Sequence, residues 1–195
     1  MTTTVVSTDY ENIRQVALEY GAQVPFLRPA ELASDTAHSP DVVEHAVRYY
    51  EEQLNQKHDI VIMLQPTSPF RTAQHIDEAI EKFLQDPTLD SLITVKKSEY
   101  PPWWMFKADG SRLKGVLEIP GRDVFLMERQ EFPVVYAANG GVHVTRRDYL
   151  KKTGCLVNSK NNGFYVMSEE DSIDIDTQTD MDLAEIELKR RAVRV

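Results

Sequence analysis

The stretch DIVIMLQPTSPFRT, residues 59–72, decides the fold of this chain. Its apolar part, residues 60–64, is unbroken, which is typical of a strand in a parallel sheet that helices cover on both faces. Pro66 and Pro69 exclude a helix directly after the strand, because each proline fixes φ and lacks a backbone donor. Thr72 is a residue type that caps helices. We therefore predict a central strand, a rigid turn and then a helix.

Helical and strand-like segments alternate on both sides of this stretch. Apolar residues recur at helical spacing over residues 11–20, 40–54 and 72–86. Short apolar or β-branched runs separate them, over residues 3–7 and 91–95. Ser39 and Pro40 mark the start of the second helix, with the Ser39 hydroxyl as the expected cap. The alternation predicts an α/β protein with a doubly wound, mostly parallel sheet, built as a single domain over residues 1–195.

Residues 100–135 depart from this alternation. The segment holds hairpin-like turns around Asp109-Gly110 and Pro120-Gly121, and an aromatic pair, Trp103 and Trp104. We predict an inserted β-rich arm. An exposed aromatic pair on such an arm more often buries itself in a partner subunit than stacks on a ligand.

Composition excludes several classes of function. The 195 residues include 31 Asp and Glu against 22 Lys and Arg, a formal net charge of -9, which makes nucleic acid an unfavourable partner. No stretch approaches the roughly 20 apolar residues of a membrane helix. The single Cys155 excludes an intrachain disulfide and a thiolate metal cluster. We expect a soluble, cytoplasmic protein.

Asp174 and Asp176 form the most informative polar pattern. On a strand, residues two apart share a face, so SIDID over residues 172–176 would present both carboxylates together. A hard cation such as Mg²⁺ relieves their repulsion and completes its octahedron with water and phosphate oxygens. The alternative is an exposed acidic strand end that leads into a last helix, predicted from about Thr179 with a capping box to Asp182.

Other polar residues lie where loops meet predicted elements. Gln65 follows the carboxyl end of a strand, where open α/β sheets bind ligands. Arg28 and Ser39 flank a loop suited to phosphate, and Arg129 with Asn139 could recognise a sugar carboxylate and hydroxyls. Each set also has a structural interpretation.

For Gln65 the structural interpretation is a two-proline connection between strand and helix. For Arg28 it is an ion pair with Glu31 or Asp35.

Four segments, in this order, carry a resemblance: LRPAELASDTAHS, LQPTSPFRT, NGGVHVT and SIDIDTQTDMDLAE. Together they resemble the CMP-sialic acid synthetases, the acylneuraminate cytidylyltransferase family, over nearly the whole chain. The resemblance implies transfer of CMP from CTP to the anomeric hydroxyl of a sialic-acid-like nonulosonic acid, with Mg²⁺ required and pyrophosphate released. It also implies a homodimer in which residues 100–135 form the arm.

By matching motifs, the resemblance assigns roles to individual residues. It implies that Asp174 and Asp176 hold the metal and carry catalysis. Arg28 and Ser39 fall on nucleotide-site positions. The positions that fall on the sugar site are Gln65, Arg129 and Asn139.

Two other functions stay open at this point. One is a nucleotidyltransferase for another sugar acid, such as 3-deoxy-octulosonate. The other is a non-catalytic dimerising remnant, because the N-terminal strand and basic triphosphate loop of the family are not found before Thr3, and Ala137 replaces a usual Arg.

Overall fold

The computed structural model describes residues 3–193 of the chain. Its residues cluster into two compact units. Unit 1 holds the described residues up to Met63, with Ile80–Leu92 and Val142–Gly163. Unit 2 holds Leu64–Ala79, Ile93–Gly141 and the described residues from Phe164.

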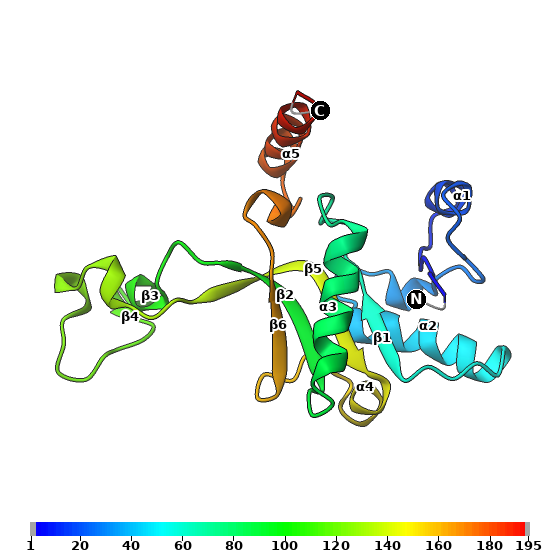
Figure 1. Ribbon diagram of the computed structural model, residues 1–195, viewed down its shortest axis with the longest axis horizontal. Helices are drawn as coiled ribbons and strands as arrows, with labels where there is room; N and C mark the ends of the chain where they lie inside the picture. Colours follow the sequence, from blue (N-terminus) through cyan, green and yellow to red (C-terminus); the bar gives the residue numbers. More distant parts are fainter. Residues whose placement is uncertain (1–2, 194–195) are drawn as a thin grey trace. The chain divides into compact units, whose positions relative to one another are not determined.

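Four strands form the main sheet in the order β1-β5-β2-β6 (Figure 1). They are β1 (Ile60–Met63), β2 (Ser91–Lys97), β5 (Tyr136–Arg146) and β6 (Asn162–Val166). β5 is antiparallel to β1, with Ile60 opposite Arg146 and Met63 opposite His143.

Backbone hydrogen bonds give the direction of the other strand pairs. Arg146 N donates to Asp90 O and Ser98 N to Val135 O, so β2 is antiparallel to β5. Beyond the other edge of β2, Asp90 N donates to Asn161 O and Met167 N to Val95 O, as in a parallel pair. Three strands therefore share one direction and β5 opposes them, which confirms the α/β class.

The predicted position of the apolar strand is wrong. Within residues 3–193, β1 lies at the edge of the sheet and its four residues are half-buried, not fully covered. The predicted strand over residues 3–7 is reduced to an isolated parallel bridge between Val5 and Gln23. Too few residues align there to extend a ladder.

Four of the five α-helices in the described residues lie close to their predicted ranges, whereas α4 is a helix that the sequence analysis does not predict. The five are α1 (Glu11–Glu19), α2 (Ser39–Gln53), α3 (Ala73–Gln85), α4 (Arg147–Thr153) and α5 (Gln178–Ala192). Thr72 caps α3 as predicted, because its Oγ1 accepts from His75 N at 3.3 Å. None of the helices in the described part of the chain is both long and apolar enough to cross a membrane.

Two predicted caps are wrong by one or two residues. Ser39 is already inside α2, and His38 occupies the cap position without a side-chain hydrogen bond. Once its backbone is helical, Ser39 cannot act as the cap. At α5 the capping box is formed by Thr177 and Asp180, two residues before the predicted pair.

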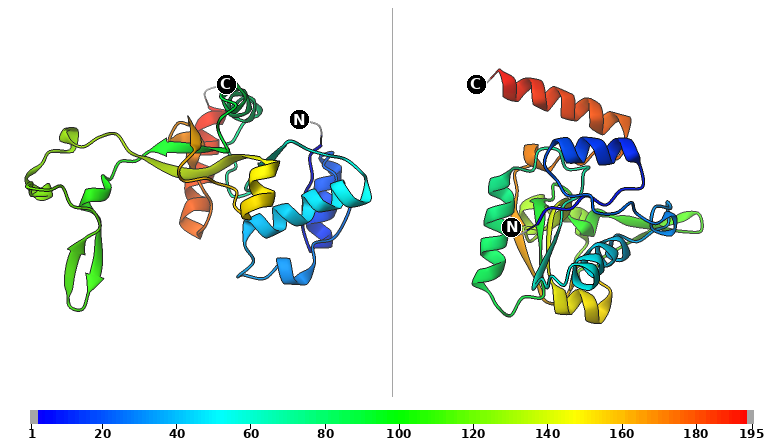
Figure 2. Two further views of the ribbon diagram at one scale, coloured as in Figure 1. Left: turned by 90° about the horizontal axis from the view of Figure 1, so that it is seen from below. Right: turned by 90° about the vertical axis from the view of Figure 1, so that its right-hand side faces the viewer.

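Unit 1 has helices on both sides of its strands. Figure 2 shows α2 and α4 on one side and the C-terminal part of α3 on the other. Buried Arg147 of α4 forms bidentate hydrogen bonds with Glu44 and Glu51 of α2, at 2.7–3.0 Å. These carboxylates raise the pKa of Arg147. The cluster ties α4 to α2.

The arm in unit 2 has its own small core. β3 (Phe106–Asp109) and β4 (Arg112–Gly115) pair as a separate antiparallel sheet. The predicted exposed tryptophan pair is instead half-buried against Phe132: Trp103 stacks on its ring at 5.3 Å, and Trp104 meets it edge-on at 5.4 Å. Trp104 Nε1 also donates to Val124 O at 3.0 Å.

We expect Arg147→Ala to lower the free energy of unfolding by about 3 kcal/mol, because it leaves Glu44 and Glu51 facing each other without a cation. Urea denaturation monitored by circular dichroism measures the loss. Arg48→Ala is the matched control: its pair with Glu52 is exposed, so its loss stays below about 0.5 kcal/mol. Equal losses in the two variants would contradict this role for the cluster.

Candidate active site

Residues 173–177, here called the aspartate segment, carry Asp174 and Asp176. They lie between the 3-10 turn η5 (Glu170–Ser172) and α5. The segment is not the predicted strand. Its backbone is held instead by one hydrogen bond, from Ile175 N to Thr67 O at 2.9 Å, and by the capping box at Thr177. One bond to a turn cannot form a ladder, which is the reason why the alternating pattern does not produce a strand.

Asp174 has the chemical character expected of a cation ligand. Its Oδ1 atom is buried without a hydrogen-bond partner among the described residues, whereas Asp176 is exposed. A buried carboxylate oxygen without a partner is costly, and a bound cation removes that cost. In residues 3–193 no group of three His, Cys, Asp or Glu side chains could hold a metal. An ion bound at Asp174 would therefore take other ligands from water or substrate, as Mg²⁺ accepts.

The turn after β1 is fixed by Arg71. Its Nη1 donates to Gln65 O at 2.9 Å and to Gly141 O at 2.8 Å, so one guanidinium joins the turn to β5. Burial lowers the pKa of Arg71. The sequence alone gives Arg71 no role, although it lies in residues 59–72. One of the two carbonyls that it binds, Gly141 O, is 70 residues away in the chain, and no local pattern predicts that contact.

Gly140 brings β5 against Gln65. Its φ is +70°, and a Cβ there would overlap Gln65 Oε1 and stand 3.3 Å from Ser68 Oγ. The left-handed backbone favours glycine, and a side chain here would force the end of the Gln65 side chain to move. Gly140 of the NGG segment therefore lies beside the Gln65 amide.

Asn139 is buried, and its amide is fully engaged within unit 2. Oδ1 accepts from Thr94 Oγ1 at 2.6 Å and from Gly141 N at 3.2 Å. Nδ2 donates to Ser172 Oγ at 2.8 Å and to Met167 Sδ at 3.3 Å. The observed contacts of Asn139 are therefore structural: it fixes β5 to the start of the aspartate segment. Its contact with a sugar stays a prediction.

The remaining predicted site residues are less closely placed. Arg28 donates to Ser7 Oγ at 3.2 Å, to Ser7 O and, at 3.5 Å, to Leu32 O, so the alternative ion pair with Glu31 or Asp35 is wrong. Ser39 is exposed at the start of α2. Both belong to unit 1.

Arg129 begins the 3-10 turn η4 (Arg129–Glu131) in the arm. Its side chain is exposed and has no hydrogen bond or ion pair to any residue from 3 to 193. It shares unit 2 with Gln65, Asn139, Asp174 and Asp176.

We expect Gly140→Ala to destabilise the protein more than Gly154→Ala. Both glycines have positive φ, but a Cβ at Gly154 meets open space. The Gly154 variant therefore measures backbone strain alone, about 1 kcal/mol, and the Gly140 variant adds about 1 kcal/mol, because the end of the Gln65 side chain has to move. Chemical denaturation of both variants gives the difference. Equal losses would show that the approach to Gln65 is not tight.

Comparisons with known proteins agree on one family. A family model described as "Cytidylyltransferase" matches residues 1–102. Post-translational flagellin modification protein B of Campylobacter coli is 32% identical over 189 residues, which cover 96% of this chain and 77% of that protein. The CMP-N,N'-diacetyllegionaminic acid synthase of Legionella pneumophila is 31% identical over 195 residues, which cover 97% and 80%.

A solved structure has a similar fold. The CMP:2-keto-3-deoxy-manno-octonic acid synthetase, determined in complex with CTP, matches with a TM-score of 0.66 and 14% sequence identity. The match covers 98% of this chain and 82% of that one. At this identity the match supports the fold and not the substrate.

Proposed function

Because this chain belongs to the cytidylyltransferase family, we propose that it transfers CMP from CTP to the anomeric hydroxyl of a nonulosonic acid and releases pyrophosphate. Nonulosonic acids are nine-carbon sugar acids such as sialic, legionaminic and pseudaminic acids. The relative that makes CMP-N,N'-diacetyllegionaminic acid, aligned over 97% of this chain, supports this substrate class.

The observation that carries the proposal is the buried Oδ1 of Asp174, which has no hydrogen-bond partner in residues 3–193. We assign Asp174 and Asp176 as the ligands of one Mg²⁺. When bound, the ion neutralises charge on the triphosphate and on the departing pyrophosphate. The protein supplies the position: Thr67 O and the Thr177 cap fix the backbone on both sides of Asp174. A preorganised Asp174 is what phosphate chemistry requires, because positioning and electrostatics carry most of it.

We assign the other residues to the two substrates. Arg28 and Ser39 bind the nucleotide, and Gln65 and Arg129 bind the sugar acid. Gln65 is half-buried beside Gly140, where its backbone is already fixed by Arg71, so its amide group can orient a hydroxyl with little loss of entropy. Asn139 borders the sugar site through the backbone that it holds in place.

We further propose that the enzyme is a cytoplasmic homodimer joined through the arm. Large apolar side chains are exposed along the arm, with Leu126 84% and Leu113 71% accessible. A cluster of this kind is typical of a surface that a partner covers. The free Cys155 and the use of CTP fit a reducing cytoplasm.

We expect the wild-type chain to release pyrophosphate from CTP with Mg²⁺ and a nonulosonic acid, and Asp174→Asn to reduce this rate at least about a hundredfold. The variant keeps the shape of the side chain but removes the charge that attracts the cation. A coupled phosphate assay with sialic, legionaminic and pseudaminic acids measures both rates. The same assay with 3-deoxy-octulosonate tests the second sugar class.

Asp182→Asn is the control, since Asp182 is exposed on α5 and contacts Gln178. Its rate should equal that of the wild type. Full activity of Asp174→Asn would reassign Asp174 to structure. A folded wild-type chain that releases no pyrophosphate with any of these sugars would favour a non-catalytic protein. Turnover with 3-deoxy-octulosonate alone would favour a nucleotidyltransferase for that sugar acid.

We expect Leu126→Glu to convert a dimer into a monomer, because it places a charge on the apolar face of the arm. Sedimentation velocity at micromolar concentration reports the mass. Leu84→Glu is the matched control, because Leu84 is also exposed but lies on α3, outside the arm. A wild-type chain that sediments as a monomer would contradict the proposed assembly.

A further inference from the structure

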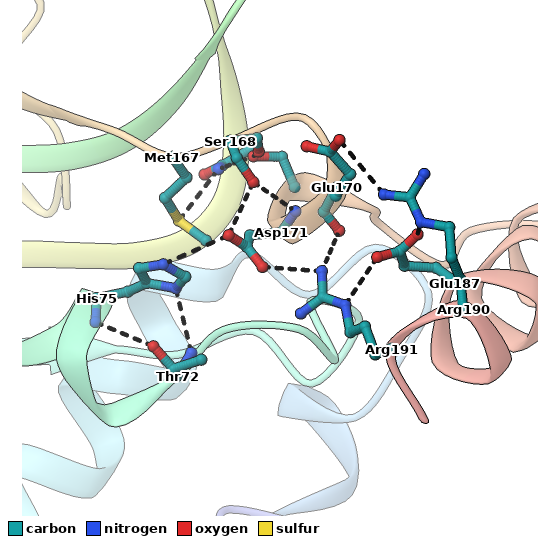
Figure 3. Close-up of polar contacts among 11 residues, drawn as sticks. Thr72, His75, Met167, Ser168, Glu170, Asp171, Glu187, Arg190 and Arg191 are labelled. Atoms are coloured by element: carbon teal, nitrogen blue, oxygen red, sulfur yellow. Dashed lines mark hydrogen bonds and ion pairs between the residues drawn. The ribbon is translucent and has the colours of Figure 1, made fainter. Parts of the chain in front are cut away.

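Arg191, near the end of α5, reaches back to the turn that precedes the aspartate segment. Its Nη2 donates to Glu170 O at 3.0 Å and to Asp171 Oδ1 at 2.9 Å, and its Nε donates to Glu187 Oε1 at 2.8 Å. Figure 3 shows the guanidinium between these three partners. One side chain thus fastens the far end of the helix to η5.

Asp171 connects Arg191 to two further side chains of unit 2. Its Oδ2 accepts from Ser168 Oγ at 2.7 Å and lies 3.6 Å from His75 Nε2 of α3 (Figure 3). Burial would raise the pKa of Asp171, but the hydrogen bonds from Ser168 and Arg191 outweigh it and hold the pKa below its ordinary value. The carboxylate is therefore charged when it meets Arg191.

Ser172 continues the connection towards the site. It is buried, its Oγ donates to Ser168 O at 2.6 Å, and it accepts from Asn139 Nδ2 at 2.8 Å. The residues that follow are the aspartate segment itself. Because η5 ends at Ser172, its position fixes the backbone that leads to Asp174.

Arg191 also contacts the other segment that lines the site. Its guanidinium lies over the ring of buried Phe70, 4.3 Å from the centroid. Phe70 precedes Arg71 in the turn that carries Gln65 and Thr67. Cation–π contact of this kind needs the planar guanidinium more than a charge alone.

We propose that Arg191 is a positioning residue for the metal ligands: it clamps η5 and the Phe70 turn together, so that Asp174 is held ready for a divalent cation. The identity of the cation rests on the proposed function. Arg191 touches neither substrate nor metal in this role and acts through Asp171 and Phe70.

The sign of the electrostatic effect makes this inference testable. Arg191 is a cation, so its removal alone should strengthen the binding of a divalent metal nearby. Loss of positioning should weaken it. Arg190 provides the matched control, because it carries the same charge and contacts Glu170 and Glu187 but neither Asp171 nor Phe70.

The experiment compares Arg191→Met, Arg191→Lys and Arg190→Ala in the full chain. Without any ligand, hydrogen exchange measures the amides of residues 172–177. Titration with Mn²⁺ alone, followed by electron paramagnetic resonance, measures metal affinity. We expect Arg191→Met to exchange about tenfold faster in this segment and to bind Mn²⁺ about tenfold more weakly. Arg191→Lys should show both changes to a lesser degree, and Arg190→Ala neither.

Exchange rates and Mn²⁺ affinity equal to those of the wild type would overturn the inference. Weaker Mn²⁺ binding in Arg190→Ala to the same extent would also overturn it. If Arg191→Met does not fold, Arg191→Lys and Asp171→Asn give the same two measurements. Neither measurement uses CTP or sugar. A wild-type chain that binds Mn²⁺ but releases no pyrophosphate therefore refutes the proposed function, while the Arg191 and Arg190 variants still test the positioning role. A wild-type chain that binds no Mn²⁺ refutes both.

Discussion

One backbone hydrogen bond, from Ile175 N to Thr67 O, joins the aspartate segment to the turn after β1. The structure around it depends on keeping that bond short, because the aspartate segment has no sheet ladder to support it. A single backbone hydrogen bond contributes only about 1 kcal/mol. The neighbouring contacts therefore have to fix both segments independently before the bond can define a site.

Unit 2 fixes the two segments with different chemistry. Arg71 holds the turn by donating hydrogen bonds to two backbone carbonyl oxygens. Within residues 3–193 it forms no ion pair with a carboxylate. The aspartate segment is fixed by amide, hydroxyl and ion-pair contacts, chiefly those of Asn139 and Asp171. The turn is thus fixed without acidic groups, and the acidic groups lie in the segment that we propose binds the divalent ion.

Unit 1 shows a purely structural use of similar residue types. Arg147 lies between Glu44 and Glu51, which accept four hydrogen bonds from its guanidinium. Asp174 differs in the property that matters for binding, since one of its buried oxygens has no partner in the described residues. The contrast separates charges that stabilise the fold from a charge that is available to a ligand.

The sequence by itself determined the α/β class, the three N-terminal helices, the cap at Thr72 and the family, because these depend on local spacing and on short ordered motifs. The contact between Gln65 and Gly140 came from the structure, and the assignment of Gln65 to a sugar site stays a prediction. Only the tertiary structure decided that β1 lies at the edge of the described sheet, that residues 173–177 are not a strand, and that Trp103 and Trp104 pack on Phe132. It alone assigned roles to Arg71, Ser172 and Arg191. Their partners are 20 to 70 residues away in most cases, and no local pattern records which distant carbonyl, amide or ring a side chain will meet.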